Sequence, residues 1–257
     1  MAIYEVLHGL VLRETLSKEA DKILTVLTAE RGKLTVIARG ARRKNSRITA
    51  ASELYVYSEL TAYESHGYMM LTEAATIELF PGLRADIEAL SLASYFAELT
   101  ETVTGEGEDA SLLLQHLLNA FYALGALKKD PVQVKAAFEL RLMALAGFAP
   151  LLDACMVCGG SVEEGAAFDI VGGGLLCPAC GREKGGAALS PASLAALRHM
   201  VTAPAKKLYA FSLDGAAMAE LGSLTERYTL SQMERRFSAL DYYKSLKLTT
   251  NRNIQQE

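Results

Sequence analysis

Short hydrophobic runs rich in β-branched and aromatic residues recur along the first 80 residues. They predict five strands, beginning near Tyr4, Ile23, Leu34, Leu54 and Tyr68. The second and third runs are separated by Ala29-Glu30-Arg31-Gly32, a Gly-containing turn that predicts a hairpin. Five strands in so short a segment suit a closed barrel better than an open sheet, because closure leaves no unpaired edge.

The hydrophobic period changes to that of helices at Pro81. Asp130-Pro131 and Ser190-Pro191 each combine an N-cap side chain with a proline at the first helical position, so both predict helix starts. Helical patterning resumes from about Asp214 to Lys247. We therefore predict an α+β multi-domain chain, in which a barrel domain (1–80) precedes a mainly helical body (81–150 and 187–257) that carries an insert (151–186).

The insert contains all four cysteines of the chain, in two Cys-x-x-Cys-Gly copies. The spacing C-x2-C-x18-C-x2-C, formed by Cys155, Cys158, Cys177 and Cys180, is typical of a four-thiolate zinc site. Four thiolates complete the tetrahedron and leave no position for water or substrate, so we expect one structural zinc ion per chain. Redox-active or inert thiols are the alternatives. A redox Cys-x-x-Cys opens a helix after a buried strand, and we expect neither pair to have that setting.

Charge is distributed very unevenly along the sequence. The chain has a net charge of −4 and a pI near 5.7, which alone would argue against a nucleic-acid partner. Residues 31–50, however, contain no acid and seven cations: Arg31, Lys33, Arg39, Arg42, Arg43, Lys44 and Arg47. Clustered cations contact phosphates without reading sequence, so this segment predicts nucleic-acid binding; a solvated basic loop is the alternative. Four tyrosines on the neighbouring strands are candidates for base stacking: Tyr55, Tyr57, Tyr63 and Tyr68. Strand alternation turns half of them inward, so only some can serve.

No motif in the sequence indicates an enzyme, an export signal or a membrane span. The four histidines are scattered, and there is no phosphate-binding P-loop, nucleophile elbow or zinc-protease signature. The apolar stretches are shorter than the ~20 residues that a membrane span needs. We expect a cytoplasmic protein that is not an enzyme.

Three runs near the start carry a resemblance to a known family. Gly9–Arg13, Glu19–Thr28 and Gly32–Arg43 resemble the beginning of the bacterial RecO recombination-mediator family, and Gly147-Phe148-Ala149-Pro150 and the cysteine pairs follow in the family's order. The resemblance implies an N-terminal OB-fold, a helical domain and a zinc finger. It also implies binding of single- and double-stranded DNA, annealing of complementary strands, and loading of recombinase onto strands coated by single-strand-binding protein. RecR and the C-terminal tail of single-strand-binding protein are the implied partners, in a bacterial, nucleoid-associated setting.

An acidic partner tail with an apolar tip needs an apolar groove and cations at its rim. The segment from Leu112 to Leu145 offers surplus apolar residues, Leu113 and Tyr122, and nearby cations that we take as candidate partner contacts: Lys128, Lys129, Lys135 and Arg141. The alternative is that the apolar residues form core and the cations are solvated. A rival for the whole chain is a zinc-containing redox or RNA-modifying enzyme.

Overall fold

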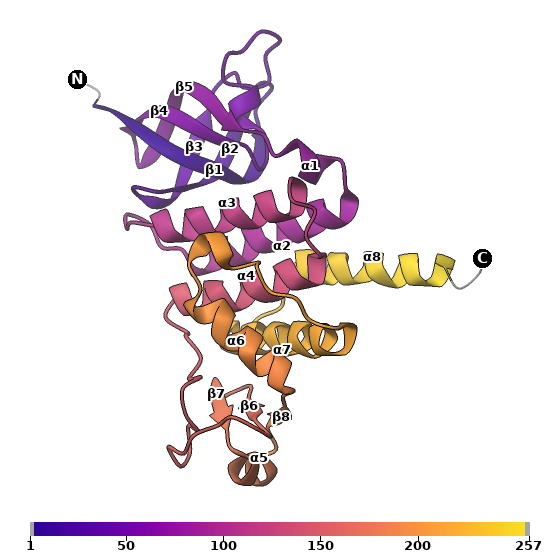
Figure 1. The fold of residues 1–257 in the computed structure, drawn as a ribbon. Coiled ribbons are helices and arrows are strands. Elements are labelled where there is room, and N and C mark those ends of the chain that lie inside the picture. The colour runs from indigo at the N-terminus through magenta and orange to yellow at the C-terminus, as the bar shows by residue number, and fades with distance from the viewer. Residues whose placement is uncertain (1–2, 255–257) are drawn as a thin grey trace. The chain divides into compact units, whose positions relative to one another are not determined.

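The computed structural model describes residues 3–254 of the 257-residue chain, with side chains described through Leu248. Its contacts divide the chain into two compact units, Met1–Ala126 and Leu127–Glu257. Figure 1 follows the chain from the strands at the N-terminus to the last helix. Each unit is described by itself below.

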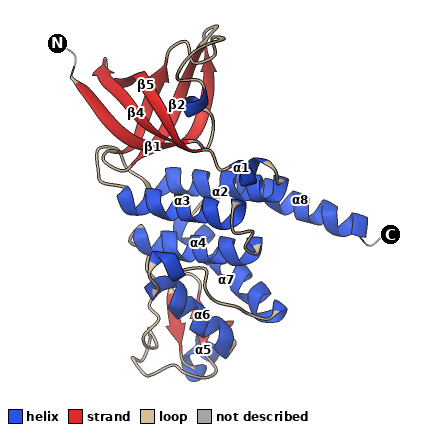
Figure 2. Ribbon diagram, turned by 45° about the horizontal axis from the view of Figure 1, so that its top comes forward, coloured by secondary structure: helices blue, strands red, loops and turns tan. Residues whose placement is uncertain are grey.

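A five-stranded closed barrel forms most of the first unit, which confirms the predicted fold of the N-terminal segment. The strands are β1 (Tyr4–Ser17), β2 (Asp21–Thr28), β3 (Gly32–Ala38), β4 (Tyr57–Ser65) and β5 (Tyr68–Glu78). They follow the order β1-β2-β3-β5-β4 around the barrel, and β1 pairs with β4 to close it. Figure 2 shows these strands in red.

A bulge in β1 and a parallel pairing of β3 with β5 contribute to the closure of the barrel. β1 has a bulge between Val11 and Arg13, and this long strand pairs with β2 along one part of its length and with β4 along another. A bulge bends a strand and increases its twist, as a strand shared by two sides of a barrel requires. β3 and β5 form the only parallel pair in the barrel, through Val36 with Met69 and Ile37 with Met70.

Alternating side chains fill the barrel. Leu24 and Val26 of β2 pack with Val36 of β3 and with Leu60 of β4, and all four are almost completely buried. Ile23, whose position alternates with theirs, is exposed. The period of two in the hydrophobic pattern therefore marks the inner face of each strand.

Three helices belong to the same unit as the barrel: α1 (Pro81–Arg84), α2 (Ile87–Val103) and α3 (Ser111–Gly125). The loop between α2 and α3 is hydrogen-bonded to the β2–β3 turn, with Lys33 N donating to Gly105 O at 2.9 Å and Gly107 N donating to Arg31 O at 3.0 Å. The two backbones approach so closely at Gly32 that a Cβ there would lie 2.6 Å from Gly105 O. The predicted boundary at 80/81 thus marks a change of secondary structure, whereas the compact units divide at 126/127.

The second unit is helical, with a small sheet inserted. Its elements are α4 (Pro131–Leu145), β6 (Ala167–Asp169), β7 (Gly174–Leu176), α5 (Pro178–Lys184), β8 (Ala187–Ala188), α6 (Pro191–Thr202), α7 (Gly215–Met233) and α8 (Ser238–Ile254). α4 packs against α6 and α7. The predicted starts of two helices are confirmed, since Asp130 Oδ1 accepts from Gln133 N at 2.9 Å and Ser190 Oγ accepts from Ser193 N at 3.2 Å.

The helical run predicted from Asp214 to Lys247 is divided into two helices. α7 ends at Met233, and Glu234 adopts a left-handed conformation with φ of 51° before α8 begins at Ser238. Few residues other than glycine adopt this conformation, and no glycine or proline marks the break in the sequence.

Candidate nucleic-acid interface and metal centre

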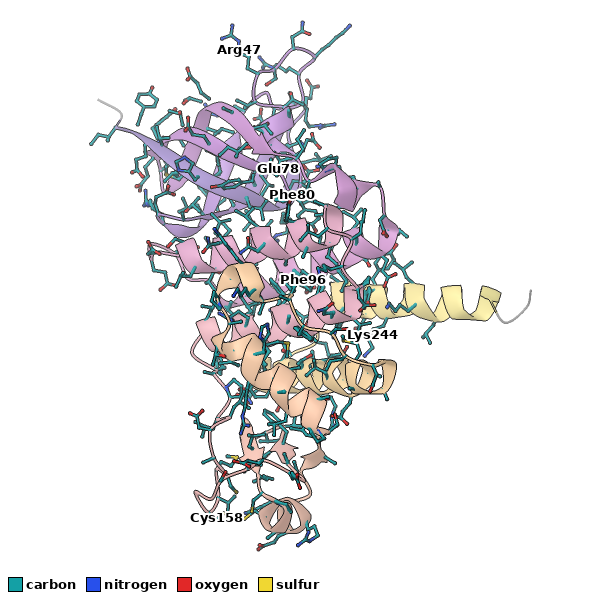
Figure 3. All side chains as sticks on the ribbon, viewed as in Figure 1. Arg47, Glu78, Phe80, Phe96, Cys158 and Lys244 are labelled. Atoms are coloured by element: carbon teal, nitrogen blue, oxygen red, sulfur yellow. The ribbon has the colours of Figure 1, made fainter. Side chains whose placement is uncertain are left out.

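The basic loop connects β3 to β4 at one end of the barrel. Its five cations, Arg39, Arg42, Arg43, Lys44 and Arg47, are all exposed. Figure 3 shows Arg47 on the part of the loop that projects from the barrel. Arg39, Arg43 and Lys44 line one open hollow together with Gly40, Asn45 and Ser46. The cations are therefore presented on one projecting segment, where several of them can contact neighbouring phosphates.

This loop is shaped by its own hydrogen bonds. Arg43 N donates to Gly40 O at 3.0 Å and Ser46 N donates to Arg43 O at 3.1 Å, which makes consecutive turns. Gly40 has φ of 68°, in the region that favours glycine. Ala41 and Ile48 are buried and anchor the loop to the barrel core.

The other two predicted cations, Arg31 and Lys33, are not part of this cluster. They lie at the opposite end of β3 from the loop, and both are half-buried. Arg31 Nη1 is 3.1 Å from the Glu5 carboxylate, and Lys33 Nζ donates to the backbone oxygen of Glu101 at 3.0 Å. The structure thus separates the seven cations of the acid-free segment into five that face solvent and two that are engaged within the first unit, Arg31 with β1 and Lys33 with α2.

The four tyrosines also divide. Tyr55 is buried, its hydroxyl donates to Ser94 Oγ at 3.0 Å, and its ring packs edge-on against Phe121. It therefore cannot stack on a base, because it precedes β4 and packs on the helices. Tyr57 and Tyr63 are half-buried, whereas Tyr68 is 49% exposed.

Lys22 is a functional candidate that inspection of the sequence missed. Its ammonium is buried and lies 2.8 Å from Glu14 and 2.9 Å from Glu53, and it also donates to Ser52 O at 3.3 Å. Burial disfavours the charge of Lys22, but the hydrogen bonds to the two carboxylates outweigh it and raise the pKa. Because Ser52 and Glu53 stand at the end of the β3–β4 connection, Lys22 fastens that end to the barrel.

The four cysteines converge in the second unit. Their Sγ atoms all lie within 4.8 Å of one another, and those of Cys158 and Cys177 are 3.8 Å apart. A zinc–sulfur bond of ~2.3 Å implies a tetrahedron with edges of about 3.8 Å, so the site has the size that a metal ion needs. Figure 3 shows Cys158 beside the helix α5.

Backbone hydrogen bonds shape each knuckle and prepare the thiols for a cation. Gly159 N donates to Cys155 O at 2.8 Å and Gly181 N donates to Cys177 O at 2.8 Å. The backbone N–H groups of Cys158 and Cys177 lower the pKa of Cys155 to about 6, whereas hydrogen bonding with Cys177 raises the pKa of Cys180 to about 12. Four crowded thiols cannot all ionise unaided, and a divalent cation among them would favour the thiolate form of each. The four cysteines can therefore bind a metal ion.

One expectation about these cysteines is wrong. Cys177 follows the buried strand β7 directly and is the N-cap of α5, so Cys177-Pro178-Ala179-Cys180 does open a helix after a buried strand. The Cys177 pKa is lowered, first by the backbone N–H of Cys180. A redox motif needs only two cysteines. Here the sulfur atoms of Cys155 and Cys158 lie beside those of Cys177 and Cys180, and this grouping of four distinguishes the site from such a motif.

The candidate partner contacts have different environments. Lys128 and Lys129 are exposed in the connection before α4. Lys135 is buried, with its ammonium 2.9 Å from Glu139 and 2.9 Å from Glu226, so it is not a rim cation. Its helix is buried on nearly all sides, which a surface interpretation of the sequence did not anticipate.

Arg141 is also engaged within the second unit. Its Nε donates to Met200 O at 2.7 Å and its Nη2 donates to Ala203 O, which ties α4 to the end of α6. Tyr122 is 53% exposed and Leu113 is half-buried, but both belong to the first unit and not to the unit of the four cations. Lys128 and Lys129 remain the candidate partner contacts.

The chain matches two family models that together span most of its length. "Recombination protein O N terminal" matches residues 1–80 and "Recombination protein O C terminal" matches residues 84–241. Among the residues described, no helix has the length and apolar character to cross a membrane.

Curated relatives cover nearly the whole chain. A "DNA repair protein RecO" of Acetivibrio thermocellus is 32% identical over 239 residues, covering 93% of this chain and 95% of that protein. One of Symbiobacterium thermophilum is 32% identical over 251 residues, covering 96% and 99%. One of Desulforudis audaxviator is 31% identical over 246 residues, covering 95% and 98%.

Proposed function

Because the chain belongs to the RecO family of DNA repair proteins, we propose that it binds single- and double-stranded DNA, anneals complementary strands and helps load recombinase onto strands coated by single-strand-binding protein. The observation that carries this proposal is the projecting loop with five exposed cations on a closed OB-type barrel. The role involves no covalent chemistry. Its setting is the bacterial cytoplasm, with the protein associated with the nucleoid.

The physical basis of annealing is charge neutralisation. Two DNA strands repel each other through their phosphates, and a cation that replaces condensed counterions on one strand lowers that repulsion. Arg42, Arg43 and their neighbours act in this way without reading sequence, so any pair of complementary strands is a substrate. The barrel supplies the rigid base from which the loop projects.

The test reverses two loop charges. Arg42→Glu with Arg43→Glu should weaken binding to unrelated single-stranded oligonucleotides alike and should slow annealing. If each arginine contacts one phosphate, the slope of log affinity against log salt should become shallower by about 1.4, at ~0.7 per phosphate of a single strand. Lys206→Glu with Lys207→Glu is the matched control, since both lysines are exposed in the second unit and the change in net charge is the same.

The outcome of this pair of variants decides the proposal. Loss of affinity in the loop variant alone supports it. Equal affinity and slope in the loop variant and in the parent protein would contradict DNA contact by the loop. Equal loss in both double variants would show that only net charge matters.

The proposed metal is zinc, held by Cys155, Cys158, Cys177 and Cys180 as one structural ion per chain. Zinc suits four thiolates in a tetrahedron, and it would connect the two knuckles that flank the glycine-rich segment. The rival redox function gains one observation, the position of Cys177 at the start of α5. Reversible formation of a disulfide in the metal-loaded protein would favour that rival.

RecR and the acidic C-terminal tail of single-strand-binding protein are the proposed protein partners. Lys128 and Lys129 are the proposed contacts for the carboxylates of the tail, because both are exposed. Lys128→Glu with Lys129→Glu should weaken binding of a tail peptide and leave DNA binding by the loop unchanged. Unchanged peptide affinity would exclude these two lysines.

A further inference from the structure

Two short runs of sequence, Glu19–Lys22 and Gly40–Arg43, come together in the barrel. Asp21 Oδ1 accepts a hydrogen bond from Gly40 N at 2.8 Å. Ala20 O accepts from Arg42 N at 3.0 Å. Glu19 O accepts from Arg42 Nη1 at 3.1 Å. The turn between β1 and β2 and the first residue of β2 therefore support the beginning of the basic loop.

Asp21 differs from Glu19 and Ala20 because it holds the beginning of the loop with its side chain. The contacts of Glu19 and Ala20 use backbone oxygens, which any substitution keeps. The Asp21 carboxylate is charged and half-buried, and hydrogen bonds to charged acceptors are stronger than neutral ones. Its donor, Gly40, has the left-handed conformation at which the chain turns from β3 into the loop.

The next residue fastens the other end of the same connection. Lys22 donates to Ser52 O and pairs with Glu53, just before β4. The first two residues of β2 thus hold both ends of the loop that carries the cations. Lys22 is unsuitable for a test, because its loss would leave Glu14 and Glu53 without the buried cation between them.

We propose that Asp21 is a positioning residue for DNA binding, which holds the basic loop in the shape that presents Arg42 and Arg43 to phosphates. The inference rests on the proposed function of that loop. Five cations in nine residues repel one another. Without the Asp21 tie the loop would adopt many conformations, and binding would have to restrict them at an entropic cost. An acid beside a DNA-binding loop then increases affinity for DNA, although its charge alone would reduce it.

This opposition of charge and geometry gives the test. Asp21→Ala removes both the negative charge and the hydrogen-bond acceptor, whereas Asp21→Asn removes the charge and keeps an acceptor oxygen. Glu19→Ala is the matched control, since it removes one exposed negative charge from the same turn and keeps the backbone oxygen that binds Arg42. Binding of a single-stranded oligonucleotide would be measured for all three in the full-length protein.

Asp21→Ala should bind DNA about tenfold more weakly than the parent, as expected for the loss of the hydrogen bond that orders the loop. Asp21→Asn and Glu19→Ala should bind as tightly as the parent or more tightly. The salt slope should be the same in all of them, because the number of phosphate contacts does not change. Hydrogen exchange at the amides of Gly40 and Arg42 should be faster in Asp21→Ala alone, while its melting temperature stays near that of the parent.

Two results would overturn the inference. Asp21→Ala that binds as tightly as Glu19→Ala would show that charge alone acts at this position. Weakened binding together with unfolding of the barrel, seen as faster exchange throughout β1–β5, would assign Asp21 a general structural role. The proposed function has its own test. It fails if Arg42→Glu with Arg43→Glu leaves the affinity for DNA unchanged, whatever the result for the Asp21 variants.

Discussion

Replacing Lys135 with methionine should destabilise the second unit far more than replacing Lys244. Both lysines pair with Glu226, Lys135 Nζ with Oε2 at 2.9 Å and Lys244 Nζ with Oε1 at 2.6 Å. The side chain of Lys135 is 5% exposed and that of Lys244 is 52% exposed. Each substitution removes one positive charge, so the pair compares burial at a constant change in net charge.

The size of the expected loss of stability follows from Glu139, the buried carboxylate that Lys135→Met leaves without its cation. Glu139 is completely buried, 2.9 Å from Lys135 Nζ, and its other oxygen accepts a hydrogen bond from the hydroxyl of Thr225 at 2.8 Å. Removing one member of a buried pair costs about 3–5 kcal/mol, whereas an exposed pair contributes about 0–1 kcal/mol. At ~3 °C for each kcal/mol, Lys135→Met should lower the melting temperature of the second unit by roughly 10 °C.

The chain contains no tryptophan, so circular dichroism with urea or heat is the suitable probe. Hydrogen exchange of peptides from α4 and α7 would assign the loss to the second unit. Similar destabilisation by Lys135→Met and Lys244→Met would refute the reasoning, because it would mean that burial of the pair does not determine its contribution.

Three further predictions concern the metal site, acid stability and helix packing. Chelation, or Cys177→Ser, should release about one zinc per chain and unfold the region 151–186, because structural zinc contributes on the order of 10 kcal/mol to folding. Metal analysis that finds no zinc in the purified protein would contradict this prediction. Glu226 is partly buried, which raises its pKa, but the charges and hydrogen bonds of Lys135 and Lys244 together outweigh this effect and lower the pKa below 4.5. Its contribution to stability is therefore present above that value and should be lost as pH falls through the lowered pKa, more steeply in the parent than in Glu226→Gln. Gly82→Ala should destabilise the first unit by about 1–3 kcal/mol, because a Cβ there would overlap Gly125 O. An unchanged melting temperature would count against the close approach of α1 and α3.

Local chemistry made much of the fold readable from the sequence. Alternation and turn residues predicted the barrel, and the side chains of Asp130 and Ser190 predicted two helix starts that they cap in the structure. The spacing of the cysteines predicted that their sulfur atoms would meet. Each of these signals lies within a few residues of the feature it specifies, or repeats with a fixed period.

The predictions that failed depend on contacts between distant segments. Lys135 was taken for a surface cation, because nothing near it in sequence indicates that α4 packs against both α6 and α7. Tyr55 was assigned to a strand, but it adopts φ of 61° and packs against Phe121 in the helices. Nothing in the sequence distinguishes Lys22 from other lysines in strands, because its partners Glu14 and Glu53 come beside it only in the fold. Tertiary packing decides such cases, and a pattern of single residues does not contain it.

The hydrogen bonds between the β2–β3 turn and the α2–α3 loop also bear on how relatives can be recombined. The family models divide near residue 80, so a chimera designed from sequence similarity would exchange the barrel alone. Such an exchange would pair the Gly32 turn of one parent with the Gly105 loop of the other, where any side chain in place of Gly32 would put its Cβ 2.6 Å from the Gly105 oxygen. The piece that can be exchanged intact ends at Ala126, and it includes the helices α1, α2 and α3.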